Sequence, residues 1–230
     1  DHDIRFENVR FSYADTEVVH DINLELREGQ ISVLVGESGS GKSTLAKLLV
    51  HFYDLDGGRI TIGGQALTDM SVEALNDQIA YVSQEQFLFH TSLYENIRIG
   101  RPDASREEIL EAAHRAQCDE FLERLPDGLD TIAGDGGKML SGGERQRIAL
   151  ARALLKDAPV IVLNEATAFI DPENEEKMSI AISEIIHGKT VLIIAHRLRT
   201  ITAVDQIIVL KDGKIDGRGK HEDLLESCET

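Results

Sequence analysis

The stretch "ISVLVGESGSGKST", residues 31–44, joins a short apolar run to a glycine-rich turn. The run is rich in β-branched residues and does not alternate with polar ones, which favours a strand buried on both faces of a parallel sheet. The turn matches the pattern G-x4-G-K-[ST], in which backbone N–H groups and a helix N-terminus converge on an anion. The stretch therefore predicts a strand, a phosphate-binding loop and a helix, in that order.

The residue types within this loop have separate physical roles. Glycines supply the freedom for the turn, Lys42 places a positive charge against the outer phosphates, and the Ser43 hydroxyl reaches Mg²⁺. A strand–helix turn that binds no ligand is the alternative. We expect a nucleoside triphosphate to be bound by Gly36, Glu37, Ser38, Gly39, Ser40, Gly41, Lys42, Ser43 and Thr44.

Similar apolar runs recur along the chain. They cover residues 79–82, 160–163, 190–195 and 206–210. Helical patterns lie between several of them, at 42–52 and 175–186. Alternating strands and helices predict an α/β core with a mostly parallel sheet, as in P-loop NTPases.

Two segments differ from this core. The first 30 residues alternate apolar and polar positions, as half-buried antiparallel strands do, and 59–64 can join them. Residues 91–157 lack strand signals and look helical. We therefore expect one domain, residues 1–230, with an antiparallel N-terminal β subdomain and a helical lobe at about 91–157 inserted in the α/β core.

The composition excludes several classes of protein. The chain has 24 basic and 41 acidic residues and a net charge of −17, which disfavours nucleic acid as a partner. Its two cysteines, Cys118 and Cys228, follow no metal-ligand spacing and indicate a reducing compartment. No apolar run approaches the roughly 18 to 20 residues of a membrane-spanning helix. Because the chain begins at Asp1 rather than Met, we expect a piece of a longer polypeptide.

A second helix start is suited to an anion, in "LSGGERQRIALARALL" at 140–155. Ser141 and Glu144 match the S-x-x-E capping box, as Ser105 and Glu108 do. The glycines that follow Ser141 leave the first N–H groups of the helix bare. A Ser-Gly-Gly that only starts a helix is the alternative.

The order of these motifs resembles the nucleotide-binding domain of an ATP-binding cassette (ABC) transporter, of the bacterial exporter type. The resemblance covers nearly the whole chain. It rests on Tyr13, the loop at 36–44, Gln84 in "YVSQEQ", "LSGGERQ" at 140–146, "NEATAFID" at 164–171 and His196 in "AHRL". An ordinary phosphate-loop kinase would not need the LSGGERQ segment.

The resemblance implies ATP and Mg²⁺ as cofactors and a head-to-tail dimer, homomeric or heteromeric. Each ATP then lies between one copy's phosphate loop and Ser141, Gly142, Gly143 and Glu144 of the other copy. Binding and hydrolysis drive substrate transport by a transmembrane domain of the same or a partner chain. The expected location is the cytoplasmic face of the cell membrane, with membrane contact only through that domain.

The resemblance also implies roles around the base. Tyr13 stacks on the adenine, with core packing of its ring as the alternative, and Val18 or Val19 adds an apolar contact. Phe87 and Phe89 belong to a segment that touches the membrane domain in exporters, with packing inside the lobe as the alternative.

Further roles concern the γ-phosphate. Glu165 is the expected general base or water-orienting carboxylate, His196 contacts the γ-phosphate, and Gln84 reaches the metal and the attacking water. Asp171 belongs to a loop that communicates between the two sites. An N-cap before Pro172 is the alternative or additional role of Asp171.

Asn164 departs from the family pattern, which has Asp at this position. Together with Ser43 and Gln84 it is an expected metal contact, but an amide lacks the charge of a carboxylate and carries an NH₂ donor. We therefore expect ATP binding with weakened hydrolysis, whether the residue is natural or engineered. A binding-only regulatory cassette and an ABC-type ATP switch that does not transport are the alternative functions.

Overall fold

The computed structural model describes residues 1–83, 87–134, 137, 139–165, 172–195 and 204–219. The chain divides into two compact units. The first contains residues 1–81, 159–165 and 188–230, and the second contains 82–158 and 166–187. Each unit is described by itself.

The first unit is built on a six-stranded sheet of order β10-β9-β3-β8-β7-β6. Strands β3, β7, β8 and β9 pair in parallel, whereas β10 runs antiparallel to β9 at the edge. The predicted mostly parallel sheet is therefore confirmed. The bounds are β3 Ile31–Val35, β6 Ile79–Ser83, β7 Val160–Asn164, β8 Thr190–Ile194, β9 Gln206–Lys211 and β10 Lys214–Gly219.

A second, antiparallel sheet of order β2-β1-β4-β5 belongs to the same unit. Its strands alternate buried and exposed residues, which confirms the half-buried strands expected near the N-terminus. The bounds are β1 Ile4–Tyr13, β2 Thr16–Leu26, β4 Gly57–Ile62 and β5 Gln65–Ala66. The 3₁₀ turn η1 (Leu67–Asp69) and the helix α2 (Val72–Gln78) follow β5.

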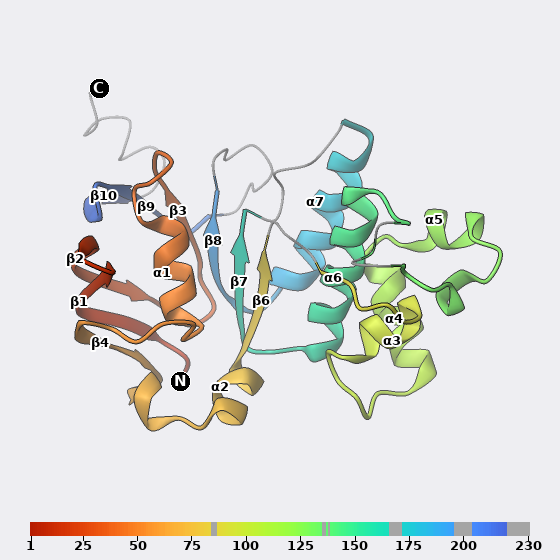
Figure 1. Ribbon diagram of the computed structural model, residues 1–230, viewed down its shortest axis with the longest axis horizontal. Coiled ribbons are helices and arrows are strands. Elements are labelled where there is room, and N and C mark those ends of the chain that lie inside the picture. The colour runs from red at the N-terminus through yellow and green to blue at the C-terminus, as the bar shows by residue number, and fades with distance from the viewer. Residues whose placement is uncertain (84–86, 135–136, 138, 166–171, 196–203, 220–230) are drawn as a thin grey trace. The chain divides into compact units, whose positions relative to one another are not determined.

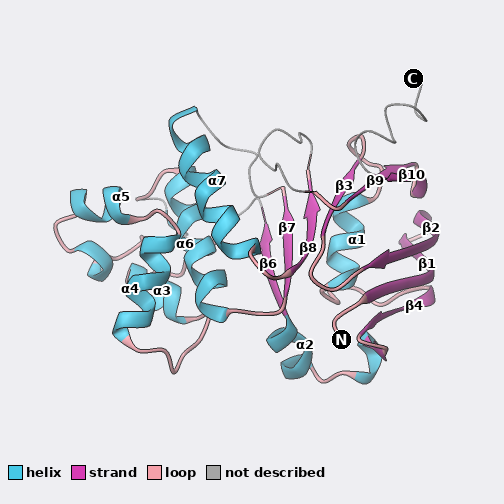
Figure 2. Cartoon of the chain, turned by 180° about the vertical axis from the view of Figure 1, so that it is seen from behind, coloured by secondary structure: helices cyan, strands magenta, loops and turns pink. Residues whose placement is uncertain are grey.

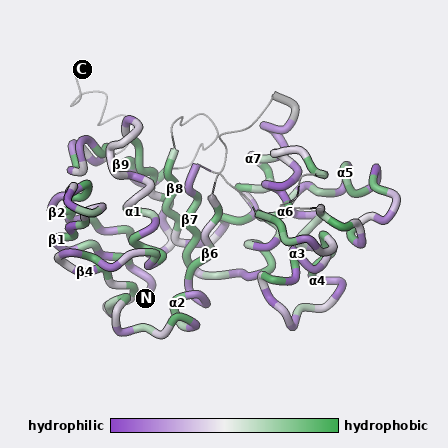
Figure 3. Tube along the Cα trace, in the orientation of Figure 1, coloured by the Kyte–Doolittle hydropathy of each residue, from purple (hydrophilic) through white to green (hydrophobic). Residues whose placement is uncertain are grey.

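Helix α1 (Lys42–Leu49) lies beside both sheets (Figure 1). One core cluster joins apolar side chains from β1, β2 and β4 with those of α1 and the central strands β3, β7 and β8. Strand β8 is accordingly drawn mainly in hydrophobic colours (Figure 3). Burial on both faces explains why β7 and β8 read as continuous apolar runs rather than alternating ones.

Helix α1 ends earlier than the expected 42–52. His51 adopts a left-handed backbone with φ of 61°. The His51 N–H donates to the Leu48 carbonyl oxygen at 3.1 Å, and the Phe52 N–H donates to that of Lys47 at 2.9 Å. This pair of bonds is a Schellman ending, normally built on glycine, which is why the sequence did not indicate it.

The second unit is helical in the part of the chain that the structure describes (Figure 2). Buried Leu and Ile side chains of α3, α4 and α6 form its interior, together with the Phe121 ring of α5. The bounds are α3 Leu93–Arg98, α4 Arg106–Arg115, α5 Asp119–Arg124, η2 Gly128–Asp130, α6 Gly142–Lys156 and α7 Pro172–Ile186. Among the described residues, no helix is both long and apolar enough to cross a bilayer.

Candidate functional site

The phosphate loop lies between β3 and α1, and its glycines have distinct structural reasons. Gly39 and Gly41 have left-handed backbones, with φ of 82° and 100°. Gly36 instead lies against strand β9. A Cβ atom added to Gly36 would stand only 2.4 Å from the Leu210 carbonyl oxygen. Glycine is therefore required by conformation at two positions and by a close backbone approach at the third.

The turn between β9 and β10 holds this loop in place. The Gly213 N–H donates to the Ser40 carbonyl oxygen at 2.9 Å, and the Gly213 carbonyl oxygen accepts from the His20 N–H at 2.9 Å. Gly213 has φ of 74°, and a Cβ there would lie 2.3 Å from the Val18 carbonyl oxygen. No motif in the sequence pointed to this support, so it was missed.

Opposite charges meet at the end of β7. The Lys42 Nζ lies 3.6 Å from the Glu165 Oε1, and the Lys42 side chain is only 4% exposed. Glu165 has a left-handed backbone with φ of 55°, and its N–H donates to the Ile194 carbonyl oxygen at 2.9 Å. A strained backbone of this kind is common where a carboxylate is aimed at a site. The two predicted charges are thus brought together.

Asn164 links the loop to β6. Its Oδ1 accepts from the Ser43 hydroxyl at 3.2 Å, while its Nδ2 donates to the Tyr81 hydroxyl at 2.9 Å. The amide is therefore oriented with oxygen toward Ser43 and nitrogen away from it. Tyr81 was not among the predicted site residues: it opens the segment "YVSQEQ", but only Gln84 of that segment was expected to have a role.

The side-chain oxygen atoms beside the loop are of the kind that binds Mg²⁺. Ser43 and Asn164 present a hydroxyl and an amide oxygen to each other, and Mg²⁺ prefers oxygen ligands. Both side chains are neutral, however, so this pair of oxygen ligands brings no negative charge to balance the cation. The arrangement suits a metal whose charge is balanced mainly by phosphate oxygens.

Tyr13 occupies an aromatic cluster at the end of β1. Its ring meets those of Phe11 and Tyr53 edge-on, at centroid distances of 4.9 and 5.5 Å. Its hydroxyl lies 3.1 Å from the Thr44 Oγ1, and 39% of the residue is exposed. Packing and base stacking are thus compatible, because the ring is anchored near the loop but not enclosed.

The two valines that were expected near the base differ in exposure. Val19 is 0% exposed and belongs to the core cluster, so its side chain cannot touch a nucleotide in this arrangement. Val18 is only partly buried. Of the two, Val18 has more side-chain surface available to a ligand, and the apolar contact with the base stays a prediction.

In the second unit, Ser141 begins α6 through a reciprocal capping box. Its side chain accepts from the Glu144 N–H at 3.2 Å, and the Glu144 Oε1 accepts from the Ser141 N–H at 3.0 Å. Ser141 and Gly142 are exposed, whereas Gly143 is half-buried against Asn174. The predicted cap is confirmed, and it presents the bare helix start to solvent.

Near this helix, an aromatic pair lies on the surface of the second unit. Phe87 and Phe89 are 62% and 51% exposed, and their rings meet edge-on at 5.3 Å. The buried Asn96 side chain accepts from the Phe89 N–H at 2.8 Å and donates to its carbonyl oxygen at 3.1 Å. Arg152 of α6 in turn donates to the Asn96 carbonyl oxygen at 2.9 Å, and burial lowers the pKa of Arg152. The Phe89 backbone is thus anchored to a buried side chain, while both rings lie on the surface rather than inside.

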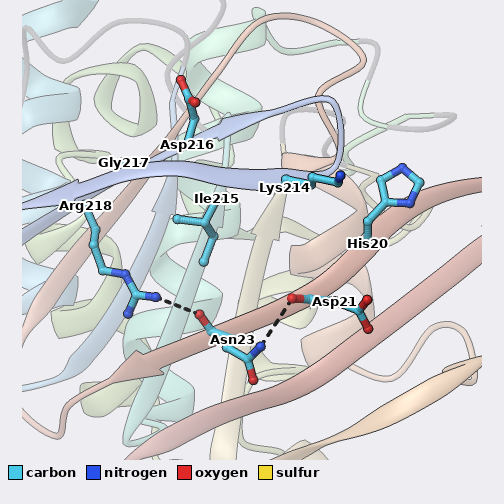
Figure 4. A pocket seen from close by; sticks show the side chains of 8 residues that line it. All are labelled: His20, Asp21, Asn23, Lys214, Ile215, Asp216, Gly217 and Arg218. Carbon is cyan, nitrogen blue, oxygen red and sulfur yellow. Dashed lines mark hydrogen bonds between the residues drawn. The ribbon is translucent and has the colours of Figure 1, made fainter. Parts of the chain in front are cut away.

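A separate groove lies between the edge strands β2 and β10 (Figure 4). It has a volume of about 560 Å³, and Arg218 spans it by donating to the Asn23 carbonyl oxygen at 3.1 Å. None of the predicted site residues lines it.

Three predicted site residues lie outside the described residues. They are Gln84, Asp171 and His196. Their roles remain predictions.

Comparisons with known proteins agree with the motif order. A family model described as "ABC transporter" matches residues 19–168. Curated relatives include proteins named "ATP-dependent lipid A-core flippase". The one from Legionella pneumophila (strain Paris) is 48% identical over 225 residues, covering 97% of this chain and 38% of the relative. The one from Escherichia coli (strain K12) is 46% identical over 227 residues, covering 97% and 39%.

A solved structure gives the same picture. It is titled "Structure of a bacterial Atm1-family ABC exporter with ATP bound" and matches with a TM-score of 0.92 and 40% identity. The match covers 98% of this chain and 40% of the other. The chain thus spans about two-fifths of the length of the proteins it matches.

Proposed function

Because this chain belongs to the ABC transporter family, we propose that it binds ATP with Mg²⁺ in a head-to-tail dimer and thereby drives transport by an associated transmembrane domain. The observation that carries the proposal is the junction of β3, the phosphate loop and α1, with Lys42 and Glu165 facing each other beside it. A charge of each sign at one loop suits binding and then cleavage of a terminal phosphate.

The chain's own residues divide the work. The loop N–H groups and Lys42 hold the β- and γ-phosphates, and Tyr13 contacts the base. When the γ-phosphate draws Lys42 toward itself, the Glu165 carboxylate is released to orient the attacking water. Ser43 and Asn164 would hold Mg²⁺, which supplies neutralisation of phosphate charge.

A second copy completes the site in this proposal. The exposed Ser141 and Gly142 offer bare N–H groups at a helix N-terminus, where anions bind favourably. One ATP can therefore bridge two chains that otherwise repel each other through their net charge of −17. Opening then follows when hydrolysis removes the γ-phosphate.

We further propose that the exposed Phe87 and Phe89 dock on the transmembrane domain at the cytoplasmic face of the membrane. Two adjacent aromatic rings exposed on a surface, with the Phe89 backbone anchored by Asn96, suit a protein contact. Movement of this surface would pass the nucleotide state to the membrane part.

Hydrolysis is expected to be slow, because Asn164 lacks the negative charge that would fix the metal. Steady-state ATPase assays of the chain and of Asn164→Asp test this directly. We expect the substitution to raise the turnover at least about tenfold, equivalent to about 1.4 kcal/mol in the barrier. Equal rates would show that the charge at this position is dispensable.

The neutral amide also favours a second candidate, a regulatory cassette that binds ATP without turning it over. Glu165→Gln in the Asn164→Asp background separates the two. If Asn164→Asp hydrolyses ATP and the double variant does not, the chain carries complete catalytic machinery apart from the charge. Absence of turnover in every variant would favour the regulatory role.

A further inference from the structure

The Asn164 amide lies between two hydroxyl groups. It accepts a hydrogen bond from one of them and donates a hydrogen bond to the other. The residue is 7% exposed at the end of β7, with Oδ1 toward Ser43 and Nδ2 toward Tyr81. Both ends of a carboxylate are oxygen atoms, whereas an amide has an oxygen at one end and an NH₂ group at the other. Which way the amide is turned therefore decides whether an oxygen or an NH₂ group faces the metal side.

The Tyr81 ring packs against a neighbouring aromatic ring. It meets the Phe52 ring edge-on at a centroid distance of 5.5 Å. Tyr81 also lies on β6, the strand next to β7 in the sheet. Its hydroxyl is thereby kept 2.9 Å from the Asn164 Nδ2.

We propose that Tyr81 is a positioning residue, whose hydroxyl accepts from the Asn164 amide and so satisfies the buried NH₂ group while the amide oxygen faces Ser43 and the metal. The inference rests on the proposed function, because it concerns the metal bound with ATP. It assigns a role to a residue of the "YVSQEQ" segment for which no role was expected, and the amide at position 164 makes that role necessary.

The physical reason is the cost of an unbonded NH₂ group in the interior. Without the Tyr81 hydroxyl, the orientation seen here would leave the Asn164 Nδ2 buried with no acceptor. The reversed amide would instead donate to the Ser43 hydroxyl and leave its oxygen unbonded, which buried structures tolerate better than an unbonded N–H. Loss of the hydroxyl therefore favours the orientation that repels a cation.

The test compares four chains: the unsubstituted chain, Tyr81→Phe, Asn164→Asp and the double variant. Two affinities are measured for each. The affinity for ATP is measured in EDTA by calorimetry. The affinity of the ATP-bound chain for Mn²⁺ is measured by electron paramagnetic resonance. Thermal unfolding verifies that each variant is folded, and Tyr94→Phe is the control for loss of a tyrosine hydroxyl elsewhere.

In the Asn164 chain, we expect Tyr81→Phe to weaken Mn²⁺ binding about tenfold and to leave ATP affinity in EDTA within about twofold. In the Asn164→Asp chain, we expect the same change to alter Mn²⁺ binding by less than about twofold, because either carboxylate oxygen can face the metal. Tyr81→Leu, which also lacks the hydroxyl, should give the same loss if Tyr81→Phe does not fold.

An equal Mn²⁺ effect in both backgrounds, or no effect in the Asn164 chain, would overturn the inference. A parallel loss of ATP affinity in EDTA would also overturn it, since a general structural role has that signature. Failure of the unsubstituted chain to bind ATP would contradict the proposed function itself. The two failures are therefore distinguishable.

Discussion

The phosphate loop of the first unit and the Ser141 helix start of the second are both suited to anions, but they are held differently. The Ser141 cap is closed by its own Glu144, three residues away. The loop is shaped from outside, by backbone atoms of Leu210 and Gly213 that are more than a hundred residues away. The cap is thus a local structure, whereas the loop depends on the completed sheet.

This difference decides what substitutions should do. Where the loop meets β9, at Gly36, even a methyl group collides with fixed backbone, and the cost depends on the surrounding fold. At the cap, a lost side-chain bond costs about 1 kcal/mol and leaves the rest of the unit intact.

The largest effect is expected at Gly36. A methyl group there would stand 2.4 Å from the Leu210 carbonyl oxygen, so the loop must move away from its phosphate-binding shape. We expect Gly36→Ala to weaken ATP binding at least about a hundredfold, or about 2.8 kcal/mol, by calorimetry.

Gly39→Ala is the matched control in the same loop. Gly39 has φ of 82° but nothing within 4 Å of its Cβ position, so only backbone strain of about 1 to 2 kcal/mol opposes the change. Equal losses at Gly36 and Gly39 would contradict the view that contact with β9 shapes the loop.

The next effect concerns Gly213, whose N–H donates to the Ser40 carbonyl oxygen of the phosphate loop. Gly213 and Gly188 have similar backbones, with φ of 74° and 70°, but only at Gly213 would a Cβ meet another chain segment, at 2.3 Å. We expect Gly213→Ala to lower the thermal unfolding midpoint by about 10 °C and Gly188→Ala by about 3 °C. ATP affinity should fall only for Gly213→Ala, and a fall in both would remove the special role of this turn.

The smallest effect concerns the cap. Ser141→Ala and Ser105→Ala each remove a capping box, on α6 and α4, so each should cost about 1 kcal/mol of stability. Only Ser141→Ala should also weaken ATP-dependent dimerisation, measured by analytical ultracentrifugation. If Ser105→Ala weakened dimerisation equally, the Ser141 effect would be one of stability alone.

The same comparison explains how far the sequence led. The capping boxes, the buried strands and the loop motif depend on neighbouring residues, and the order of motifs indicated the ABC family, which the comparisons confirm. Contacts between distant segments left no such signal. Neither the Gly213 support nor the Tyr81 bond to Asn164 could be predicted, because nothing near either residue specifies its partner.

The early end of α1 and the burial of Val19, neither of which was expected from the sequence, also have physical reasons. His51 ends α1 with a left-handed backbone that sequence patterns normally assign to glycine. Val18 and Val19 are both apolar, but alternation along β2 buries Val19 in the core and leaves Val18 partly buried against it. Position on a strand, rather than residue type, decided which valine can meet a ligand.

The central claim is that one ATP is shared between the phosphate loop of one copy and the Ser141 helix of another. Complementation between two defective chains tests it most directly. One carries Lys42→Ala, which impairs the loop, and the other carries Ser141→Arg, which blocks the helix start, with Ser105→Arg as the control for a damaged cap. Donor and acceptor dyes on the two chains report their association in Mg-ATP by energy transfer.

We predict that each defective chain alone associates weakly, whereas an equal mixture forms heterodimers, because the mixture contains one complete site for each pair. The Ser105→Arg chain should associate as the unsubstituted chain does. If the mixture associated no better than its components, or if Ser141→Arg alone dimerised normally in Mg-ATP, the shared site would be contradicted.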